Sequence, residues 1–169
     1  MAVFFHLDRI NRLQEGMELG LHEYDVWPPE FSGVISSFHP EGLTPHGYGF
    51  LCERQLDQST FFELVLETVR RHLFPDRPSR FQCVFALESL EQAQAYRVLF
   101  PSPGWTGTIW RVEADDAFRA NLALLDFRVP AIAILSNAHA YWRGEQGLSP
   151  AFWEVLLRPP VRVLGRADE

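Results

Sequence analysis

Hydrophobic and polar residues are distributed along the chain in a way that predicts both strands and helices. Residues 2–8, AVFFHLD, are rich in aromatic and branched side chains and are typical of an extended strand. Residues 59–74, STFFELVLETVRRHLF, have apolar side chains at helical spacing and predict the clearest helix of the chain. The apolar residues that we expect on its buried face are Phe61, Leu64, Val65, Val69 and Leu73.

Polar residues indicate where this helix begins. Ser59 or Thr60 can accept a hydrogen bond from a backbone N–H group of the first turn, and Glu63 has the capping-box position relative to Thr60. Before the helix, Pro and Gly interrupt residues 24–49 so often that we expect a long irregular segment. Because such segments are usually functional, we expect this one to cover the functional site or to contact an acceptor molecule.

The second half of the chain continues the mixture of elements. We expect strands in 79–89, 107–114 and 161–166, and helices in 89–100, 115–127 and 130–144. Ser89 and Gln92 form a capping box at the start of one of these helices, and Gly144 follows the end of the last. Because strands and helices do not alternate regularly, the sequence predicts an α+β fold, with 1–169 forming a single domain.

Residues 149–160, SPAFWEVLLRPP, have two interpretations. Ser149 and Pro150 favour the start of a short helix, whereas the aromatic and aliphatic residues favour a strand that turns at the two prolines. In either case Glu154 stands inside an apolar run. Since an ionised carboxylate is costly to bury without partners, Glu154 is either an exposed or salt-bridged structural residue or a functional one.

Composition and charge narrow the choice of function. The chain has 169 residues, of which 47% are hydrophobic, and this is enough for one domain with a substantial core. Its formal net charge of −7 argues against a general nucleic-acid binder. The apolar runs are too short for a bilayer span, and the first residues do not have the pattern of a signal peptide, so we expect a cytoplasmic protein.

Several other chemistries find little support. Cys52 and Cys83 have neither disulfide nor metal-site spacing, and we expect them to be buried thiols. His39 and His46, with His22 or Glu41, could ligate a metal, but their spacing matches no familiar site. The chain also contains no G-x-S-x-G elbow, no P-loop and no G-x-G-x-x-G motif.

Three patches in a characteristic order resemble the ADP-ribosyltransferase superfamily. A His lies in the first strand (VFFHLD), a strand leads into a small-residue helix that carries a Tyr (VFALESLEQAQAYR), and a Glu heads a late strand before a proline turn and another strand (FWEVLLRPPVRVLGR). The chain looks most like the branch with a His–Tyr–Glu triad, which includes poly-ADP-ribose polymerases and diphtheria-type toxins. The segments FFHLDRINRL and PSRFQCVFA also resemble a small family of uncharacterised bacterial proteins.

The resemblance implies a fold of split antiparallel sheets with flanking helices, and an enzyme that binds NAD as its substrate. Its expected catalytic residues are Glu154, His6 and Tyr96. Its expected dinucleotide-binding residues are His6, Arg9, Arg80, Phe85 and Tyr96, with the two arginines suited to the pyrophosphate. Without the resemblance, His6 and Tyr96 would be ordinary packing residues, the two arginines surface ion-pair partners, and Tyr141 and Trp142 either wall or core residues.

The expected activity is cleavage of the nicotinamide–ribose bond, with transfer of ADP-ribose to a macromolecular acceptor or hydrolysis of NAD. The chain has no carboxylate two residues before Glu154 and no His-Gly dipeptide after the first strand, which argues against arginine as the modified residue. We expect a toxin, effector or defence protein whose acceptor is a protein rather than a nucleic acid. We also expect an immunity or antitoxin partner. Delivery into another cell by a dedicated secretion system is the alternative to cytoplasmic residence.

Two other functions stay open at this point. One is a non-catalytic module that uses the same fold to interact with a protein or nucleotide. The other is a nucleic-acid-modifying toxin, which would need a basic patch, and the arginines that could form it are Arg9, Arg12, Arg77 and Arg80.

Overall fold

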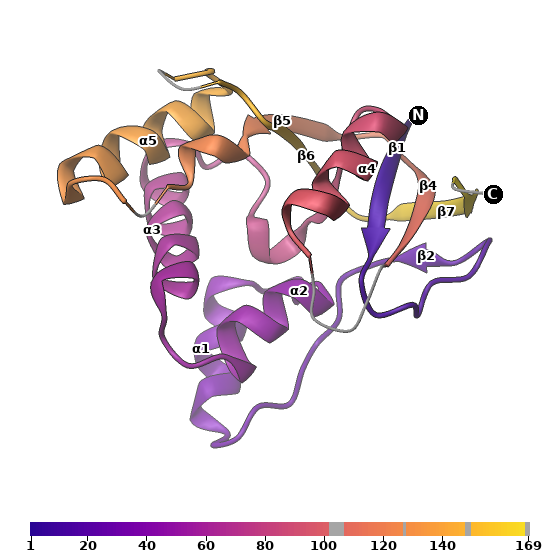
Figure 1. The fold of residues 1–169 in the computed structure, drawn as a ribbon. Coiled ribbons are helices and arrows are strands. Elements are labelled where there is room, and N and C mark those ends of the chain that lie inside the picture. Colours follow the sequence, from indigo (N-terminus) through magenta and orange to yellow (C-terminus); the bar gives the residue numbers. More distant parts are fainter. Residues whose placement is uncertain (102–106, 127, 148–149, 168–169) are drawn as a thin grey trace.

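Two antiparallel sheets form the framework of the protein (Figure 1). The computed structural model describes residues 1–101, 107–126, 128–147 and 150–167. One sheet has four strands, in the order β1 (Ala2–Asp8), β4 (Thr108–Ala114), β7 (Val161–Arg166) and β2 (Glu18–Leu19). The other has three, in the order β3 (Val84–Ala86), β6 (Trp153–Leu157) and β5 (Ala117–Asn121).

Five α-helices accompany the sheets within the described residues. They are α1 (Glu30–Phe38), α2 (Pro45–Tyr48), α3 (Gln58–Leu73), α4 (Leu90–Leu99) and α5 (Ala131–Arg143). A π-helical turn (Gly49–Glu53) follows α2, and two 3₁₀ turns (Arg80–Gln82 and Leu122–Leu124) lead into β3 and out of β5. The expected α+β class is therefore confirmed. None of the described helices is long and apolar enough to cross a bilayer.

Strand β6 separates two parts of the hydrophobic core, because successive side chains of a strand point to opposite faces. Val155 and Leu157 pack against apolar residues of β4 and β7, so that the two sheets share one core. Leu156 belongs instead to the core between the three-stranded sheet and the helices α3 and α5. By this alternation Glu154 faces the helices.

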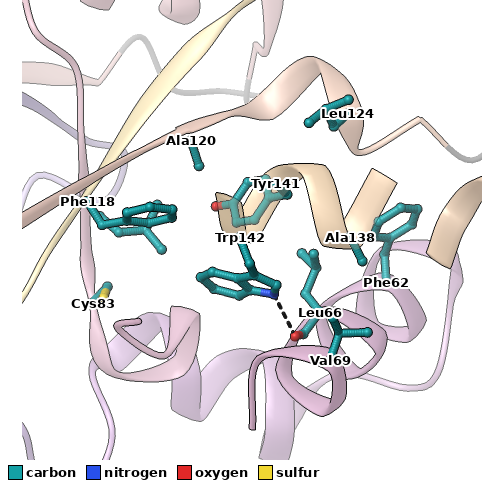
Figure 2. Close-up of a cluster of buried hydrophobic side chains, with 11 residues drawn as sticks. Phe62, Leu66, Val69, Cys83, Phe118, Ala120, Leu124, Ala138, Tyr141 and Trp142 are labelled. Atoms are coloured by element: carbon teal, nitrogen blue, oxygen red, sulfur yellow. Dashed lines mark hydrogen bonds between the residues drawn. The ribbon is translucent and has the colours of Figure 1, made fainter. Parts of the chain in front are cut away.

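The core under the helices contains the largest buried side chains (Figure 2). Trp142 of α5 is fully buried, stacks on Phe118 of β5 and donates a hydrogen bond of 2.8 Å from Nε1 to the Leu66 carbonyl of α3. This bond satisfies the indole N–H group, which would otherwise be costly to bury. It also fixes α5 against α3, and the two helices lie side by side in Figure 1.

The two sheets meet where β1 passes the end of β3. Phe5 and Leu87 exchange backbone hydrogen bonds of 2.9 Å in both directions. Helix α4 covers this junction, and its Ala93 packs with Leu87 and Ile109 in a small separate core. The junction therefore brings residues near the start of the chain next to residues that follow β3.

The sequence predicted several elements correctly. The strand at 2–8, the helix at 89–100 with Ser89 as its cap, the strand at 107–114, the helix at 130–144 and the strand at 161–166 all have counterparts in the structure. Gly144 ends α5 with a φ of 71°, the left-handed conformation that favours glycine. Of the two interpretations of 149–160, the strand is correct for the described residues 150–160, and Ser149 lies outside them.

Two predicted elements were wrong in type. Residues 115–126 do not form an α-helix, because β5 pairs with β6 and its side chains alternate between exposed and buried, with Phe118 and Ala120 inward. Phe127, the last residue of the predicted helix, lies outside the described residues. The segment 24–49 is not irregular throughout, since α1 and α2 lie within it. The predicted strand at 79–89 is shorter than expected, because a 3₁₀ turn takes up its first part.

The predicted orientation of α3 was wrong in part: among the residues expected on its buried face, only Val69 is buried and Val65 packs against the core. Phe61, Leu64 and Leu73 are exposed, whereas the buried face carries Glu63 and Glu67. The cap of the helix, Asp57, comes two or three residues earlier than the expected cap. The buried residues of the helix, besides these two carboxylates, are Thr60, Phe62, Leu66 and Val69.

The cap of α3 differs for a simple reason. Asp57 accepts a hydrogen bond of 2.8 Å from the backbone N–H of Thr60, and the Thr60 hydroxyl accepts one of 2.7 Å from the N–H of Asp57. This reciprocal pair satisfies two backbone donors at once. Thr60 is thus the third residue of the helix rather than its cap, and Glu63 takes no part in capping.

Two glycines in helices test the packing of the region around α1 and α2. A Cβ atom at Gly47 would lie 2.1 Å from the Phe81 carbonyl oxygen, whereas one at Gly33 would meet no atom within 4 Å. We expect Gly33→Ala to raise the free energy of unfolding by about 0.5–1 kcal/mol and Gly47→Ala to lower it by roughly 1–3 kcal/mol. Urea denaturation of both variants measures this, and equal effects of the same sign would contradict the packing.

Candidate functional site

Glu154 lies at the centre of a buried polar cluster. Its residue is only 4% exposed, and its Oε1 atom accepts hydrogen bonds from Arg80 Nη1 and from the Tyr141 hydroxyl, the latter at 2.7 Å. Among the described residues no hydrogen bond goes to Oε2. One carboxylate oxygen is therefore fixed by two donors, and the other is left for a further interaction.

Arg80 holds this cluster together from the 3₁₀ turn before β3. Its Nε and Nη2 atoms donate to the two carboxylate oxygens of Glu63 on α3, at 2.7 and 2.9 Å. Its Nη1 atom donates to Glu154 and to the Tyr141 hydroxyl oxygen. The planar guanidinium can make these contacts in three directions at once, which a lysine ammonium could not do with the same geometry.

The cluster carries two carboxylates and one guanidinium, so its formal charge is −1 if all three are ionised. Although burial alone would lower the pKa of Arg80, the charges of Glu154 and Glu63 raise it well above its ordinary value. Burial raises the pKa of Tyr141 well above its ordinary value, and Glu154 adds to this effect while Arg80 opposes it. Tyr141 therefore stays a neutral phenol that donates its proton to Glu154.

A second carboxylate of α3 is satisfied in the same way nearby. Glu67 accepts hydrogen bonds from Arg70, Arg71 and the Ser79 hydroxyl, at distances between 2.7 and 2.9 Å. These donors lower the pKa of Glu67 although its burial acts in the opposite direction. The buried face of α3 is thus held to the turn at residues 79–82 by two carboxylates.

His6 of β1 reaches the same region from the junction of the two sheets. Its Nδ1 atom lies 2.6 Å from the Phe85 carbonyl oxygen, to which it donates a hydrogen bond. Partial burial lowers the pKa of His6, although this hydrogen bond and the charge of Asp8 act against the shift. The ring of Phe85 in turn lies 4.5 Å from the Arg80 guanidinium.

Tyr96 of α4 lies close enough to Glu154 for the charge of this carboxylate to act on it. Burial raises the pKa of Tyr96, and the charge of Glu154 raises it further, while Arg9 and Arg80 lower it. Its ring packs 5.9 Å from that of Phe152, which comes two residues before Glu154. The Arg9 guanidinium lies 5.3 Å from the Tyr96 ring centre and donates to the Phe100 carbonyl at 2.7 Å.

The structure therefore gathers all six residues that the sequence singled out. His6, Phe85, Arg80 and Glu154 are linked by direct contacts, and Tyr96 with Arg9 lies beside them. Their roles in catalysis or dinucleotide binding stay predictions. Trp142, by contrast, belongs to the hydrophobic core.

Sequence reasoning missed two members of the site. Glu63 was interpreted as a capping residue, yet its position three residues before Leu66 was a signal that the two share a face of the helix. His46 was considered only as a metal ligand. Its ring packs between Phe50 and Phe85, at 4.4 and 4.6 Å, and its Nε2 atom is buried with no hydrogen-bond partner among the described residues.

The part of the chain that the structure describes contains neither a cluster of metal ligands nor an activated thiol. It contains no group of three or more His, Cys, Asp or Glu residues that could hold a metal ion. Burial raises the pKa of the Cys83 thiol far above its ordinary value. Cys52 is partly buried, and its pKa is also raised by burial and by Glu53. Neither thiol is poised to act as a nucleophile.

The comparison with protein families gives one match. A family described as "Protein of unknown function (DUF2441)" matches residues 47–169, which is more than half of the chain. The matched region contains Glu63, Arg80, Tyr96 and Glu154, whereas His6 precedes it. A comparison with curated proteins finds no match.

The cluster predicts a large effect for loss of its cation. Arg80→Met leaves Glu63 and Glu154 buried without compensation, and we expect the free energy of unfolding to fall by roughly 3–5 kcal/mol. Adding Glu63→Gln and Glu154→Gln to this variant should recover part of the loss, because the buried charges are then removed. Arg119→Met, which breaks the exposed pair with Glu88, is the control and should change stability little. Chemical denaturation of the wild type and the three variants measures these free energies of unfolding. A decrease for Arg80→Met no larger than that for Arg119→Met would contradict the role of Arg80 in the cluster.

His46 predicts how stability depends on pH. Burial lowers its pKa to about 4, while Glu63 opposes the shift and Arg80 and Arg54 assist it. Between its ordinary pKa of 6.5 and about 4, the unfolded chain binds a proton that the folded protein does not. Stability contributed by neutral His46 is therefore present above pH 6.5 and is lost as the pH falls toward 4, by up to roughly 1.4 kcal/mol per pH unit.

The measurement is the free energy of unfolding of the wild type and of His46→Gln across this pH range. The variant should show a shallower decline toward low pH. Part of the slope will persist, because burial also lowers the pKa values of His6 and His39. His72→Gln, at an exposed position of α3, is the matched control. Parallel curves of unfolding free energy against pH for the wild type and His46→Gln would show that His46 does not cause the loss of stability at low pH.

Proposed function

Because the chain belongs to the DUF2441 family, whose description assigns no activity, we propose a function from the chain's own residues: an NAD-binding enzyme of the ADP-ribosyltransferase type. It cleaves the nicotinamide–ribose bond and transfers ADP-ribose to a macromolecular acceptor, or to water. The observation that carries the proposal is the convergence of three distant segments. His6 of β1, Tyr96 of α4 and Glu154 of β6 surround Phe85 and Arg80 at the junction of the two sheets.

Glu154 has the properties that this reaction needs. Cleavage of the bond passes through an oxocarbenium-like state at the anomeric carbon of the ribose. A carboxylate that is already oriented stabilises such developing positive charge without having to reorganise. In the proposal, Oε1 stays bonded to Arg80 and Tyr141, and Oε2 contacts the ribose.

The aromatic residues would hold the two halves of NAD. The rings of Tyr96 and Phe85 are only partly buried and flank Glu154, so either can stack against the nicotinamide ring. His6, partly exposed at the edge of β1, is suited to hydrogen-bond a ribose hydroxyl through Nε2 while Nδ1 holds the Phe85 carbonyl. Arg9, also partly exposed, is the better candidate for the pyrophosphate.

Arg80 takes a different part in this proposal from the one its residue type first indicated. Its guanidinium already contacts Glu63, Glu154 and Tyr141 and is 5% exposed, so we assign it to positioning Glu154 rather than to binding phosphate. The bidentate pair with Glu63 fixes the orientation of the guanidinium, and the guanidinium then fixes Oε1 of Glu154. Such indirect support is how active sites keep a reacting group in place.

The biological setting belongs to the same proposal. An enzyme of this type would act as a toxin, effector or defence protein, would use NAD as its substrate, and would be restrained by an immunity or antitoxin partner. A protein acceptor is favoured over a nucleic acid, because the net charge of −7 opposes binding to a polyanion. It would act in the cytoplasm, either of the cell that makes it or of one that receives it through a secretion system.

One observation favours a second candidate function. Glu154 is 4% exposed and is engaged with both Arg80 and Tyr141, as in a purely structural ion pair. On that basis the domain could instead be a non-catalytic module for interaction with a protein or nucleotide. The two functions differ in one measurable respect, since only the enzyme releases nicotinamide.

The test is nicotinamide release from NAD by the purified protein, with and without a cell lysate as a source of acceptors. We expect Glu154→Gln to lower turnover by roughly a hundredfold or more with little change in the apparent affinity for NAD, because the carboxylate acts mainly in the transition state. Tyr96→Ala should weaken NAD binding instead. Glu88→Gln, at an exposed carboxylate paired with Arg119, is the matched control and should behave as wild type.

The possible results separate the two functions. Release that depends on Glu154 supports the enzyme, and dependence on lysate distinguishes transfer from hydrolysis. Equal turnover by wild type and Glu154→Gln, with both proteins folded by circular dichroism, would refute the assignment of Glu154. Absence of both binding and release by the wild type, again with and without lysate, would leave the interaction module.

A further inference from the structure

A hollow of the surface lies along the side of α3 that carries Leu64, Thr68 and Arg71, and Glu67 of the buried face also lines it. It has a volume of about 570 Å³, within the range of ligand-binding pockets, and is bounded by α1, the π-helical turn and α3. We call it the α1–α3 groove. Most of its lining is apolar, and the residues that matter for the argument are Phe31, Val34, Ile35 and Leu64.

Helix α1 supplies one wall of the groove but is not itself buried. Phe31, Val34, Ile35 and Phe38 have the i, i+3, i+4, i+7 spacing of an amphipathic helix, and all four line the groove. Yet α1 contains no buried residue, and Phe31 and Val34 are 54% and 51% exposed. An apolar helix face that lines a hollow without filling it leaves room for an apolar molecule.

The charged residues of the groove are mainly positive, in contrast to the chain as a whole. Arg54 and Arg71 line it together with Glu67, and Glu67 is already bonded to Arg70, Arg71 and Ser79. Arg54 is exposed, lies 4.2 Å from the ring of Phe50 and forms no salt bridge among the described residues. In a protein with a net charge of −7, this leaves a cation next to an apolar surface.

His39 adds a polar group at the base of the groove. It is 4% exposed, and its Nε2 atom lies 3.1 Å from Arg71 Nη2. Because a guanidinium can only donate, Nε2 is the acceptor and the proton of this histidine is on Nδ1. The Nδ1 atom is buried and makes no hydrogen bond that meets normal geometry within the described residues.

From these observations we infer that the α1–α3 groove binds an amphipathic monocarboxylate, with its alkyl or aryl body against α1 and Leu64 and its carboxylate beside Arg54. The inference is independent of the proposed enzymatic activity, because no residue of the His6–Tyr96–Glu154 group lines the groove. A single dissolved molecule fits better than an anionic bilayer, since the hollow is concave and the net charge of the protein repels such a surface.

The test uses sodium dodecanoate below its critical micelle concentration as the probe, with dodecylammonium as a partner of opposite charge. Titration calorimetry should give saturable binding of one dodecanoate, and dodecylammonium should bind at least about tenfold more weakly. Shortening the chain from dodecanoate to decanoate should weaken binding by up to about fourfold for each methylene removed. Methyl NMR signals of Val34, Ile35 and Leu64 should shift during the titration.

Three variants assign the site. Val34→Asp, at a half-exposed position that should not disturb folding, should weaken dodecanoate binding about tenfold or more, because it puts a like charge in the groove. Arg54→Gln should reduce the preference for dodecanoate over dodecylammonium. Ile132→Asp, at an exposed apolar residue of α5 that lines a different surface hollow, is the control and should bind as wild type.

The outcomes that would overturn the inference are equally specific. They are no saturable binding, equal affinity for the two probes, or equal loss in Val34→Asp and Ile132→Asp. Stronger binding to phosphatidylglycerol vesicles than to monomeric dodecanoate would show that the face docks on a membrane instead. A protein that binds dodecanoate but never turns over NAD would retain this inference and lose only the proposed function.

Discussion

The contact of Arg80 with Glu63 and Glu154 is the interaction on which the rest of the structure depends. It joins three elements: α3, β6 and the turn that precedes β3. Tyr141 extends the contact to α5. Ion pairs of this kind contribute little net stability compared with a well-packed apolar core, but they are costly to break once buried. They also allow few alternative arrangements, because every donor and acceptor needs its partner. The cluster therefore specifies how the helices sit on the three-stranded sheet.

The same contact decides which face of α3 is buried. Glu63 and Glu67 can be inside only because arginines and Ser79 meet them there, and turning them inward rotates Leu64 and Phe61 outward. Apolar side chains that would otherwise have filled the core thus become available on the surface. Helix α1 lies over some of them without closing the space, and the α1–α3 groove is the result. The burial of these carboxylates in the core thus accounts for the exposed apolar residues that help to form the groove.

The two candidate sites both use residues of α3 but differ in character. At the sheet junction, the charged groups are buried, mutually bonded and surrounded by aromatic rings, an arrangement suited to holding one carboxylate in a fixed orientation. In the groove, the charges are at the edge of an apolar surface and Arg54 is exposed.

Sequence patterns alone determined the elements that rest on local physics. The strand at 2–8, the helices at 89–100 and 130–144 and the two strands at 107–114 and 161–166 follow from periodicity, capping residues and the glycine that ends α5. The mixed order of elements was enough to give the α+β class. The resemblance of three segments to the ADP-ribosyltransferase superfamily selected His6, Tyr96 and Glu154, which the fold brings near one another.

Tertiary contacts decided everything that depends on partners far apart in the sequence. Residues 115–127 have apolar content that suits a helix as well as a strand, and pairing with β6 made part of them a strand. Local sequence could not show whether Glu154 was exposed, paired or free. Its partner Arg80 lies 74 positions away, and Glu63, which binds Arg80 from α3, lies 91 positions away. A periodic pattern says which residues share a face of an element. It does not say which face is buried when both faces carry apolar residues. In α3 the face with the carboxylates can be buried only because arginines pair with them, Arg80 from the turn before β3 and Arg71 from α3 itself.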